Sequence, residues 1–448
     1  MLSVSSPVSC VPRTPLEDWI AAKIGRPGLP PTREALADYQ LARLNETLAR
    51  VQAKSAFYRR SLGAPGLALA SLTELEQLPF TTADDLRSAP LDLVCVRQDD
   101  VDRIVTLPTS GTTGAPKRVF FTADDQELTR DFFHHGMSTF VSPGDRVLIL
   151  LPGSLPGSVG ALLEEGLARM EVTGIQHGPV SDPAHTLRVM ATEKATALVG
   201  IPVQVLGLAK LAVEERNRTA STLHSVLLST DRMPFAVAQV IGKAWGCAVY
   251  DHYGTTEMGL GGGVDCGALS GYHLREADML FEIVDPDTAK PVPDGEAGEV
   301  VFTTLTREAM PLVRYRTGDI ARFVSGPCAC GTVLKRMGHI EHRLAGGLTL
   351  PGGIVIRQGD FDEVLLPVDE IADFRVLCAH AEAPVALTVE IKSRGRTLPS
   401  EDEIVRRLAA VPRLEAALAE GLLSLDVREW QAGSQVNSGT GKRQIIYV

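Results

Sequence analysis

Short apolar runs alternate with amphipathic stretches along the first half of the chain, and this alternation restricts the fold more than any other feature. Three runs have β-strand character: RVLILLP at 146–152, ATALVGIP at 195–202 and HSVLLST at 224–230. A helical pattern, SVGALLEEGLARM at 158–170, follows the first of them. Strands separated by amphipathic helices indicate a layered α/β architecture.

The pattern of apolar, polar and turn residues changes twice toward the C-terminus. Between 279 and 313, alternating runs are separated by Asp-Pro-Asp and Pro-Asp-Gly turns, which predict a β-rich subdomain at about 265–340. A glycine-rich stretch, AGGLTLPGG, then precedes strand-like and helix-like segments in an α+β pattern. We therefore expect a large N-terminal domain of layered α/β subdomains at 1–342. A small, mobile C-terminal α+β domain is expected at 343–448.

Composition excludes several classes of protein. Of 448 residues, 44% are hydrophobic and 22% are charged, as in soluble globular proteins. The 55 acidic residues outnumber the 44 basic ones and give a net charge of −11, which argues against nucleic acid as the main partner. We find neither a leader nor an apolar stretch long enough to span a membrane, and therefore expect a cytoplasmic protein.

The segment TSGTTGAPK, at 109–117, packs hydroxyls and glycines between two strand-like runs and ends in a lysine. Glycines let a backbone approach a ligand closely, and amides and hydroxyls donate hydrogen bonds to phosphate oxygens. The segment is not a Walker loop, because Pro116 stands before Lys117. A polar turn is the alternative. We expect a triphosphate loop, here called the phosphate loop, whose binding residues are Thr109, Ser110, Gly111, Thr112, Thr113, Gly114 and Lys117.

The phosphate loop resembles the signature loop of the adenylate-forming superfamily of acyl-CoA synthetases, adenylation domains and luciferases. Further segments resemble motifs of the same family in the same order, and the resemblance runs from about residue 45 to the C-terminus. The phenylacetate-CoA ligase-like branch is the most similar. The resemblance implies that MgATP and a carboxylic acid give an acyl-adenylate, and that rotation of the small domain then admits a thiol.

The segment DHYGTTEMG is similar to the Y-G-x-T-E motif of the family. The resemblance implies that Tyr253 stacks on adenine and that Gly254 and Thr255 belong to the nucleotide site. It further implies that Thr256 binds the α-phosphate and that Glu257 binds Mg²⁺. A carboxylate that holds a hard cation neutralises charge on transferring phosphates. Taken alone, the segment also reads as a strand end with an exposed glutamate.

Three further segments resemble nucleotide-binding parts of the family. In YRTGD, the resemblance implies that Asp319 binds both ribose hydroxyls. In LLSTDRMP, it implies that Asp231 lies near the base. Arg343 corresponds to an arginine that contacts ribose and phosphate, but Ala345 stands where the family has its hinge aspartate.

The C-terminal segment NSGTGKRQIIYV resembles the family's terminal segment with its catalytic lysine, here Lys442. A flexible cation stabilises charge while a carboxylate oxygen attacks the α-phosphorus and pyrophosphate leaves. The alternative is a surface lysine near a chain terminus.

The glycine-rich turn GSLPGSVG lacks the G-x-S-x-G spacing of a serine hydrolase and lies where the family builds its carboxylate pocket. Branch resemblance favours an aryl acid. An ordinary helix with a core phenylalanine and a solvated histidine is the alternative for DFFHHGM. The residues expected to line the acid pocket are Phe133, His134, Ser154, Ser158 and Gly259.

Seven scattered cysteines argue against a disulfide framework. Cys266 and His273 stand in one short segment, and Cys328 and Cys330 stand in another. Three thiolates and one imidazole are the ligands of a closed tetrahedral Zn²⁺ site, which leaves no open position for catalysis. Cys-x-Cys is tighter than the usual Cys-x₂-Cys, so two unrelated groups of buried thiols are the alternative.

These features predict an acid-thiol ligase that uses ATP, Mg²⁺ and coenzyme A on a small, aromatic carboxylic acid. Coenzyme A is favoured because no carrier domain is recognisable in the chain. Loading of a carrier-protein phosphopantetheine, and hence an acyl carrier protein as partner, is the alternative; assembly as a homodimer is left open. An inactive nucleotide-binding regulatory protein is disfavoured because Lys117, Glu257, Asp319 and Lys442 are all present.

Overall fold

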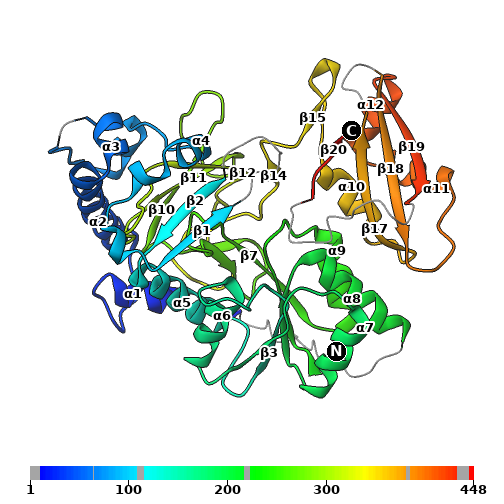
Figure 1. Ribbon diagram of the computed structural model, residues 1–448, viewed down its shortest axis with the longest axis horizontal. Coiled ribbons are helices and arrows are strands. Elements are labelled where there is room, and N and C mark those ends of the chain that lie inside the picture. Colours follow the sequence, from blue (N-terminus) through cyan, green and yellow to red (C-terminus); the bar gives the residue numbers. More distant parts are fainter. Residues whose placement is uncertain (1–10, 64, 108–115, 216–221, 380–383, 431–442) are drawn as a thin grey trace, which may run out of the picture. The chain divides into compact units, whose positions relative to one another are not determined.

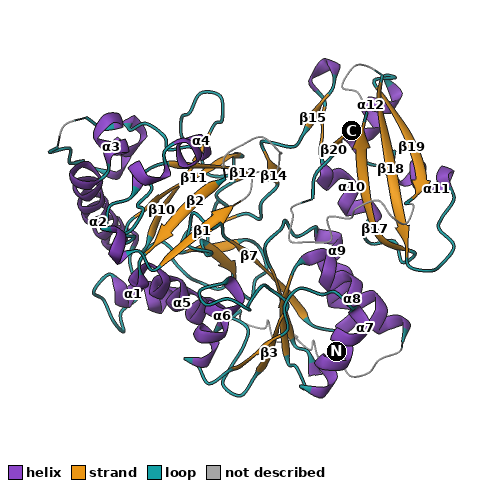
Figure 2. Cartoon of the chain, in the orientation of Figure 1, coloured by secondary structure: helices purple, strands orange, loops and turns teal. Residues whose placement is uncertain are grey.

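The structure is a computed structural model that describes residues 11–63, 65–107, 116–215, 222–379, 384–430 and 443–448. Its residues group into two compact units, each of which mixes helices and strands (Figures 1 and 2). The first unit comprises Met1–Gly144, Leu155–Val172 and Tyr250–His339, and the second comprises Asp145–Ser154, Thr173–Val249 and Ile340–Val448.

In the first unit, the phosphate loop joins two paired strands, as the sequence predicted. Strands β1 (Arg103–Leu107) and β2 (Lys117–Phe121) are antiparallel, with Arg103 opposite Phe121 and Leu107 opposite Lys117. This register puts Lys117 at the first position of β2, directly after the loop. The end of β2 is buried, so the lysine is carried by a firmly packed strand.

Two antiparallel groups of strands complete the sheets of this unit. One group begins at the C-terminal end of β7 (Ala248–Tyr253), which pairs with β8 (Gly263–Asp265). Strand β8 pairs with β9 (Tyr272–Leu274), and β9 pairs with β13 (Arg336–Met337). Strands β10 (Met279–Val284), β11 (Gly298–Thr304) and β12 (Tyr315–Ala321) form the other group. The alternation of apolar runs and turns at 279–313 is thus explained by antiparallel strands that hairpins connect.

The helices of the first unit lie mostly in its N-terminal part. Helix α5 begins with a capping box, in which Thr122 accepts a hydrogen bond from the Asp125 amide and Asp125 accepts one from the Thr122 amide. The helices are α1 (Leu16–Lys23), α2 (Arg33–Lys54), α3 (Ala56–Ser61), α4 (Ala83–Ser88), α5 (Ala123–Met137) and α6 (Val159–Ala168). Short 3₁₀ segments are Leu72–Gln77, Pro90–Leu93 and Gln98–Asp100.

The second unit contains a parallel sheet, in the order β6, β5, β3, β4. Every residue of β5 and β6 is buried, which fits the continuous apolar runs of strands covered on both faces. The strands are β3 (Arg146–Ile149), β4 (Thr173–Gln176), β5 (Ala197–Gly200) and β6 (Ser225–Leu228), and the helices are α7 (Pro183–Thr192), α8 (Pro202–Glu214) and α9 (Phe235–Trp245).

The C-terminal part of the second unit is an α+β layer with the sheet order β19, β18, β17, β20. Its elements after the short strand β14 (His342–Arg343) are β15 (Leu348–Thr349), β16 (Val355–Ile356), α10 (Gln358–Leu365), β17 (Ile371–Cys378), β18 (Val385–Ser393), α11 (Glu401–Leu408), α12 (Pro412–Ala419), β19 (Leu423–Glu429) and β20 (Ile446–Tyr447), together with the 3₁₀ segment Pro351–Gly353.

A buried ammonium group joins this layer to α8 within the second unit. Lys210 donates to the main-chain oxygens of Leu366, Val368 and Ile371 at 2.7, 2.5 and 2.9 Å. Burial lowers the pKa of Lys210 to about 8. Carbonyls at the end of α10 suit a cation, because helix C-termini carry partial negative charge.

The expected mixture of layered α/β and α+β parts is confirmed. Residues 340–448 group with 145–154 and 173–249, so the domain boundary expected at 343 stays a prediction. Within the described ranges, no helix combines the length and apolar character needed to cross a membrane.

Candidate active site

Three of the predicted motifs meet at one carboxylate in the first unit. The Lys117 ammonium, at the start of β2, donates to Oε1 of Glu257, which lies 140 residues away in sequence, in the turn after β7. The Tyr315 hydroxyl, at the start of β12, donates to the same oxygen at 3.1 Å. Glu257 is buried and Lys117 is half-buried. The end of the phosphate loop, the YGTTE segment and the YRTGD segment therefore share one site.

The charge at this site is that of an ionised carboxylate. Burial raises the pKa of Glu257, but the Lys117 ammonium and the hydrogen bonds to the carboxylate outweigh burial and hold the pKa below its usual range. Burial together with the neighbouring Glu257 charge raises the pKa of the Tyr315 phenol, which therefore stays protonated and donates. An ionised carboxylate is the ligand type that Mg²⁺ prefers.

A second pair of predicted residues lies together in the same unit. The hydroxyl of Tyr253, the last residue of β7, donates to Oδ2 of Asp319 at 3.1 Å. The Tyr253 ring stacks on Tyr272, with centroids 5.7 Å apart and planes 28° apart. Tyr272 is fixed in turn, because its hydroxyl donates to Asp251 at 2.6 Å. The residues expected to stack on adenine and to bind ribose are thus neighbours.

Glycines allow the turn that carries Glu257. A Cβ at Gly254 would lie 2.4 Å from the main-chain oxygen of Leu260, so a larger residue does not fit. Gly259 has φ +73°, in the left-handed region that favours glycine. The amides of Gly259 and Leu260 donate to Thr256 and Thr255 main-chain oxygens at 3.0 and 2.9 Å. The turn is therefore compact, with Thr255 and Thr256 half-buried.

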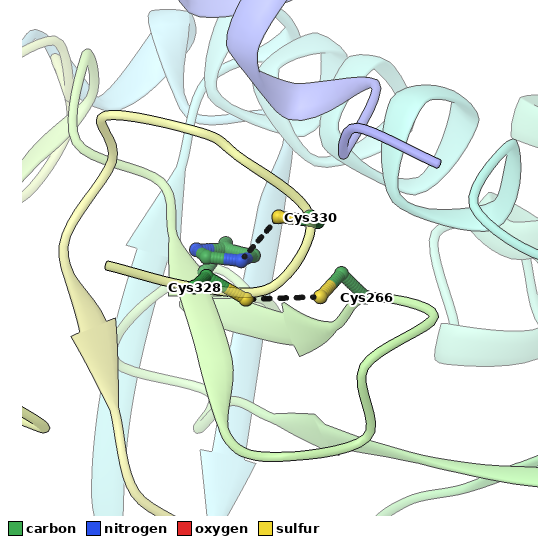
Figure 3. Close-up of side chains that lie close together, drawn as sticks. Cys266, Cys328 and Cys330 are labelled. Carbon is green, nitrogen blue, oxygen red and sulfur yellow. Dashed lines mark hydrogen bonds between the residues drawn. The ribbon is translucent and has the colours of Figure 1, made fainter. Parts of the chain in front are cut away.

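The four predicted zinc ligands form a second buried cluster of this unit, here called the Cys₃His cluster (Figure 3). The Sγ atoms of Cys266 and Cys328 are 3.6 Å apart, and Sγ of Cys330 lies 3.3 Å from Nε2 of His273. All four ligand atoms lie within 4.8 Å of one another. Nδ1 of His273 faces the Lys335 main-chain oxygen at 3.4 Å, which leaves Nε2 to a ligand.

A family model described as AMP-binding enzyme matches residues 36–305. The chain belongs to the AMP-binding enzyme family. The phenylacetate-coenzyme A ligase of Thermus thermophilus is 32% identical over 355 residues, which cover 76% of this chain and 77% of that protein. The enzyme of the same name from Escherichia coli is 28% identical over 389 residues, covering 82% of this chain and 85% of that protein. The predicted resemblance to the adenylate-forming superfamily and to its phenylacetate-CoA ligase-like branch is confirmed.

The fold of this AMP-binding enzyme is similar to that of a crystal structure of 2-hydroxyisobutyryl-CoA ligase in the postadenylation state, in complex with 2-HIB-AMP. The TM-score is 0.76 at 21% identity, and the match covers 93% of this chain and 90% of that chain. At this identity the similarity supports the fold.

Two residues that contact Glu257 in the candidate site were missed by the sequence interpretation. Tyr315 stands in the YRTGD segment, but only Asp319 was singled out there; a tyrosine at a strand start beside a predicted nucleotide ligand was a signal. Arg307 donates to the Glu257 main-chain oxygen at 2.6 Å and stands in no recognisable motif, so nothing in the sequence pointed to it.

Residues expected to line the acid pocket lie partly on α5. Phe133 is buried, and a Cβ at Gly166 of α6 would lie 3.1 Å from its Cβ. His134 stacks on His135 with centroids 4.3 Å apart, and burial lowers the pKa of His134. Gly259 contacts the same helix, because its main-chain oxygen accepts a hydrogen bond from Thr129 at 2.9 Å. These contacts bring Gly259 to α5, while the acid-binding roles stay predictions.

The other expected acid-pocket residues stand in the glycine-rich turn. Ser158 is the N-cap of α6 and donates to the Leu155 main-chain oxygen at 2.5 Å. Ser154 is exposed and belongs to the second unit. Their roles toward an acid are not tested by these local contacts.

Asp231 and Arg343 belong to the second unit, so their nucleotide contacts stay predictions. Within that unit, the Arg443 amide donates to Oδ2 of Asp231 at 3.3 Å. Seven other predicted site residues lie outside the described residues, and their assignment stays a prediction: Thr109, Ser110, Gly111, Thr112, Thr113, Gly114 and Lys442.

Proposed function

We propose that this chain is an acid-thiol ligase that uses ATP to activate a small carboxylic acid as its acyl-adenylate and then transfers the acyl group to coenzyme A. The observation that carries the proposal is the meeting of Lys117, Glu257 and Tyr315 at one buried carboxylate. Family membership and the phenylacetate-coenzyme A ligases among the relatives support it.

In the first step, a carboxylate oxygen of the acid attacks the α-phosphorus of ATP. A carbon–oxygen–phosphorus linkage forms, the bond from the α-phosphorus to its bridging oxygen breaks, and the electron pair leaves with pyrophosphate. Tyr253 and Asp319 hold the nucleoside, and Thr256 binds the α-phosphate. Lys442 stabilises the charge that develops in the transition state.

Glu257 is the residue proposed to hold Mg²⁺, and its buried, ionised carboxylate fits a hard cation. When bound, Mg²⁺ neutralises charge on the triphosphate. Lys117 is paired with Glu257 and is proposed to place its positive charge beside the phosphates when nucleotide is bound. The chain itself therefore supplies both an anion for the metal and a cation for the nucleotide.

In the second step, the thiol of coenzyme A attacks the acyl carbon, a carbon–sulfur bond forms and AMP leaves. Residues 343–448 are proposed to rotate between the steps, and Arg343 and Asp231 to contact the nucleotide.

We propose an aromatic acid, held by Phe133, His134, Ser154, Ser158 and Gly259. The names of the relatives support the aromatic acid.

The Cys₃His cluster is proposed to hold a structural Zn²⁺. Sulfur atoms 3.6 Å apart fit two thiolates of a tetrahedral site, because Zn–S bonds are about 2.3 Å long. Val11 and Ala268 pack against the three cysteines, and Glu17 of α1 accepts a hydrogen bond from the Val333 amide, three residues after Cys330, at 3.0 Å. Four protein ligands make the metal's proposed role structural.

One assay tests the proposed function. The enzyme is incubated with MgATP, a panel of aryl and short aliphatic acids, and either coenzyme A or a phosphopantetheine-bearing carrier protein, and thioesters are identified by mass. The proposal predicts an acyl-coenzyme A and one AMP per thioester. A thioester on the carrier protein alone would support the carrier-loading alternative, and no thioester would support the inactive regulatory protein. The cytoplasm is the proposed compartment, where ATP and coenzyme A are both present. Sedimentation would decide between a monomer and a homodimer, which the sequence leaves open.

A further inference from the structure

Arg307 is a buried arginine whose role goes beyond the residues assigned above. It stands in the loop between β11 and β12 and is 6% exposed. We propose that Arg307 is a positioning residue that holds the Glu257 turn in register with β2 and thereby sets Mg²⁺ affinity. This inference rests on the proposed function, because it concerns the same nucleotide site.

The first contact of Arg307 fixes the main chain of the metal-binding residue itself. Its Nη1 donates to the Glu257 main-chain oxygen at 2.6 Å. The Glu257 side chain is held separately by Lys117 and Tyr315. Main chain and side chain of Glu257 are thus fixed from different elements, which restricts both the position and the direction of its carboxylate.

The second contact reaches the strand that carries Lys117. The Arg307 guanidinium carbon lies 4.8 Å from the centroid of the Phe121 ring, at the end of β2. A cation over an aromatic ring is attracted to its face. One planar group thus lies between the strand that begins with Lys117 and the turn that carries Glu257.

The third contact of Arg307 explains why position 259 is a glycine. A Cβ at Gly259 would lie 2.6 Å from Nη2 of Arg307, so the turn closes directly over the guanidinium. The loop of Arg307 is anchored as well, since Asp125 accepts hydrogen bonds from the Glu308 and Ala309 amides at 2.8 and 2.9 Å. The arginine is therefore a fixed support and not a solvated side chain.

Burying the Arg307 charge costs free energy that an apolar side chain at the same position would not cost. Burial lowers the pKa of Arg307 to about 10, partly opposed by the Asp125 charge. Replacing a buried charge by an apolar residue of similar volume is often neutral or stabilising, so we attribute the retained guanidinium to the geometry that its hydrogen bond to Glu257 specifies.

Arg307 lines a small cavity that offers a matched control. Arg275 lines this cavity too and is likewise buried. Arg275 pairs with Asp278 at 2.6 Å and donates to the Leu128 main-chain oxygen at 2.6 Å. Among the described residues, the Arg275 side chain hydrogen-bonds to Asp278 and Leu128, and neither belongs to the Glu257 turn. Arg275→Met therefore removes a similar buried charge without touching the proposed support.

The test compares Arg307→Met, Arg307→Lys and Arg275→Met with the wild-type chain. Acid-dependent exchange of labelled pyrophosphate into ATP is measured against Mg²⁺ concentration, and ATP binding is measured by calorimetry with and without Mg²⁺. We expect Arg307→Met to raise the Mg²⁺ concentration for half-maximal exchange by about tenfold or more, since a hydrogen bond to a charged group contributes roughly a decade in affinity. Arg307→Lys retains the charge and a donor and should recover most of the loss.

The direction of the effect separates positioning from simple charge removal. Removing a positive charge near a cation site strengthens cation binding by Coulomb's law. Positioning instead predicts weaker Mg²⁺ binding for Arg307→Met and an unchanged or slightly stronger one for Arg275→Met. Equal Mg²⁺ dependence in both methionine variants, or tighter binding in Arg307→Met, would overturn the inference. A wild-type chain that exchanges no pyrophosphate would sink the proposed function, while calorimetry would still decide the role of Arg307.

Discussion

Two clusters of the first unit, the nucleotide cluster of Lys117, Glu257 and Tyr315 and the Cys₃His cluster, each join segments that are far apart in sequence. They differ in how their polar atoms are satisfied. In the nucleotide cluster, opposite charges meet and the Lys117 side chain keeps 22% of its exposure. In the Cys₃His cluster all four residues are buried and their ligand atoms face one another. Partial exposure of a paired charge suits a site that exchanges ligands, whereas closure of four ligands suits a permanent metal.

The largest effect that sharpens this contrast is expected from Glu257→Gln. The amide keeps the shape of the side chain but removes the charge that faces Lys117 and the proposed Mg²⁺, so adenylation should fall by about a hundredfold to a thousandfold. Pyrophosphate exchange is the measurement. Tyr315→Phe, which removes one hydrogen bond to the same oxygen, is the control and should cost less. Retention of exchange within a few-fold in Glu257→Gln would remove Glu257 from the site.

The Cys₃His cluster should respond in stability and not directly in chemistry. Cys328→Ser removes one of the four proposed zinc ligands and should lower the free energy of unfolding by several kcal/mol, because structural zinc contributes directly to folding. Urea unfolding and metal analysis by mass spectrometry check this. Cys95→Ala, at a buried thiol outside the cluster, is the control and should keep one zinc per chain. A wild-type chain purified without zinc and equally stable after chelation would refute the metal site.

A smaller effect is expected at the second pair of nucleotide residues. Asp319→Asn should raise the KM for ATP about tenfold, since it removes the charge of a carboxylate that accepts the Tyr253 hydroxyl and is proposed to accept ribose hydroxyls. Steady-state kinetics check this. Tyr253→Phe keeps the stacking ring and should change KM less. A larger loss in Tyr253→Phe would show that the hydroxyl, and not the carboxylate, carries nucleotide affinity.

A pH-dependent effect on stability is expected at Asp251, which accepts the hydroxyl of Tyr272, the residue before His273. Burial raises the pKa of Asp251 to about 7, partly opposed by His339. The unfolded state therefore loses its proton from about pH 4 upward while the folded state keeps it until about pH 7, so stability falls with rising pH across this window. Asp251→Asn should remove up to about 1.4 kcal/mol per pH unit of that decline, measured by urea unfolding. An unchanged slope would contradict the shifted pKa.

Much of the fold followed from hydrophobic pattern. The runs at 146–152, 195–202 and 224–230 form β3, β5 and β6, because strands buried on both faces leave continuous apolar segments. Boundaries were less readable: the run at 146–152 contains the strand Arg146–Ile149 and ends in a turn. Grouping of residues 340–448 with part of the N-terminal half depends on contacts such as those of Lys210, which no local pattern specifies.

Much of the candidate nucleotide site could be predicted from the sequence, because nucleotide chemistry demands particular residue types in short segments. Lys117, Glu257 and Asp319 were found in motifs, and the structure brings Lys117 to Glu257 and Tyr253 to Asp319. Arg307 could not be found this way, because its role depends on a main-chain oxygen 50 residues away and not on neighbours in sequence. A residue that holds a motif in place from a distant segment can be recognised only in the folded structure.

The central claim is that these segments bind MgATP so that an acid's oxygen replaces pyrophosphate at the α-phosphorus. Phenylacetate labelled with ¹⁸O in its carboxylate tests it directly, with product isotopes read by mass spectrometry after incubation with MgATP and coenzyme A. The account predicts one ¹⁸O in AMP, since the acid's attacking oxygen stays on phosphorus when the thiol displaces AMP. Label in inorganic phosphate, with ADP as the nucleotide product, would contradict it.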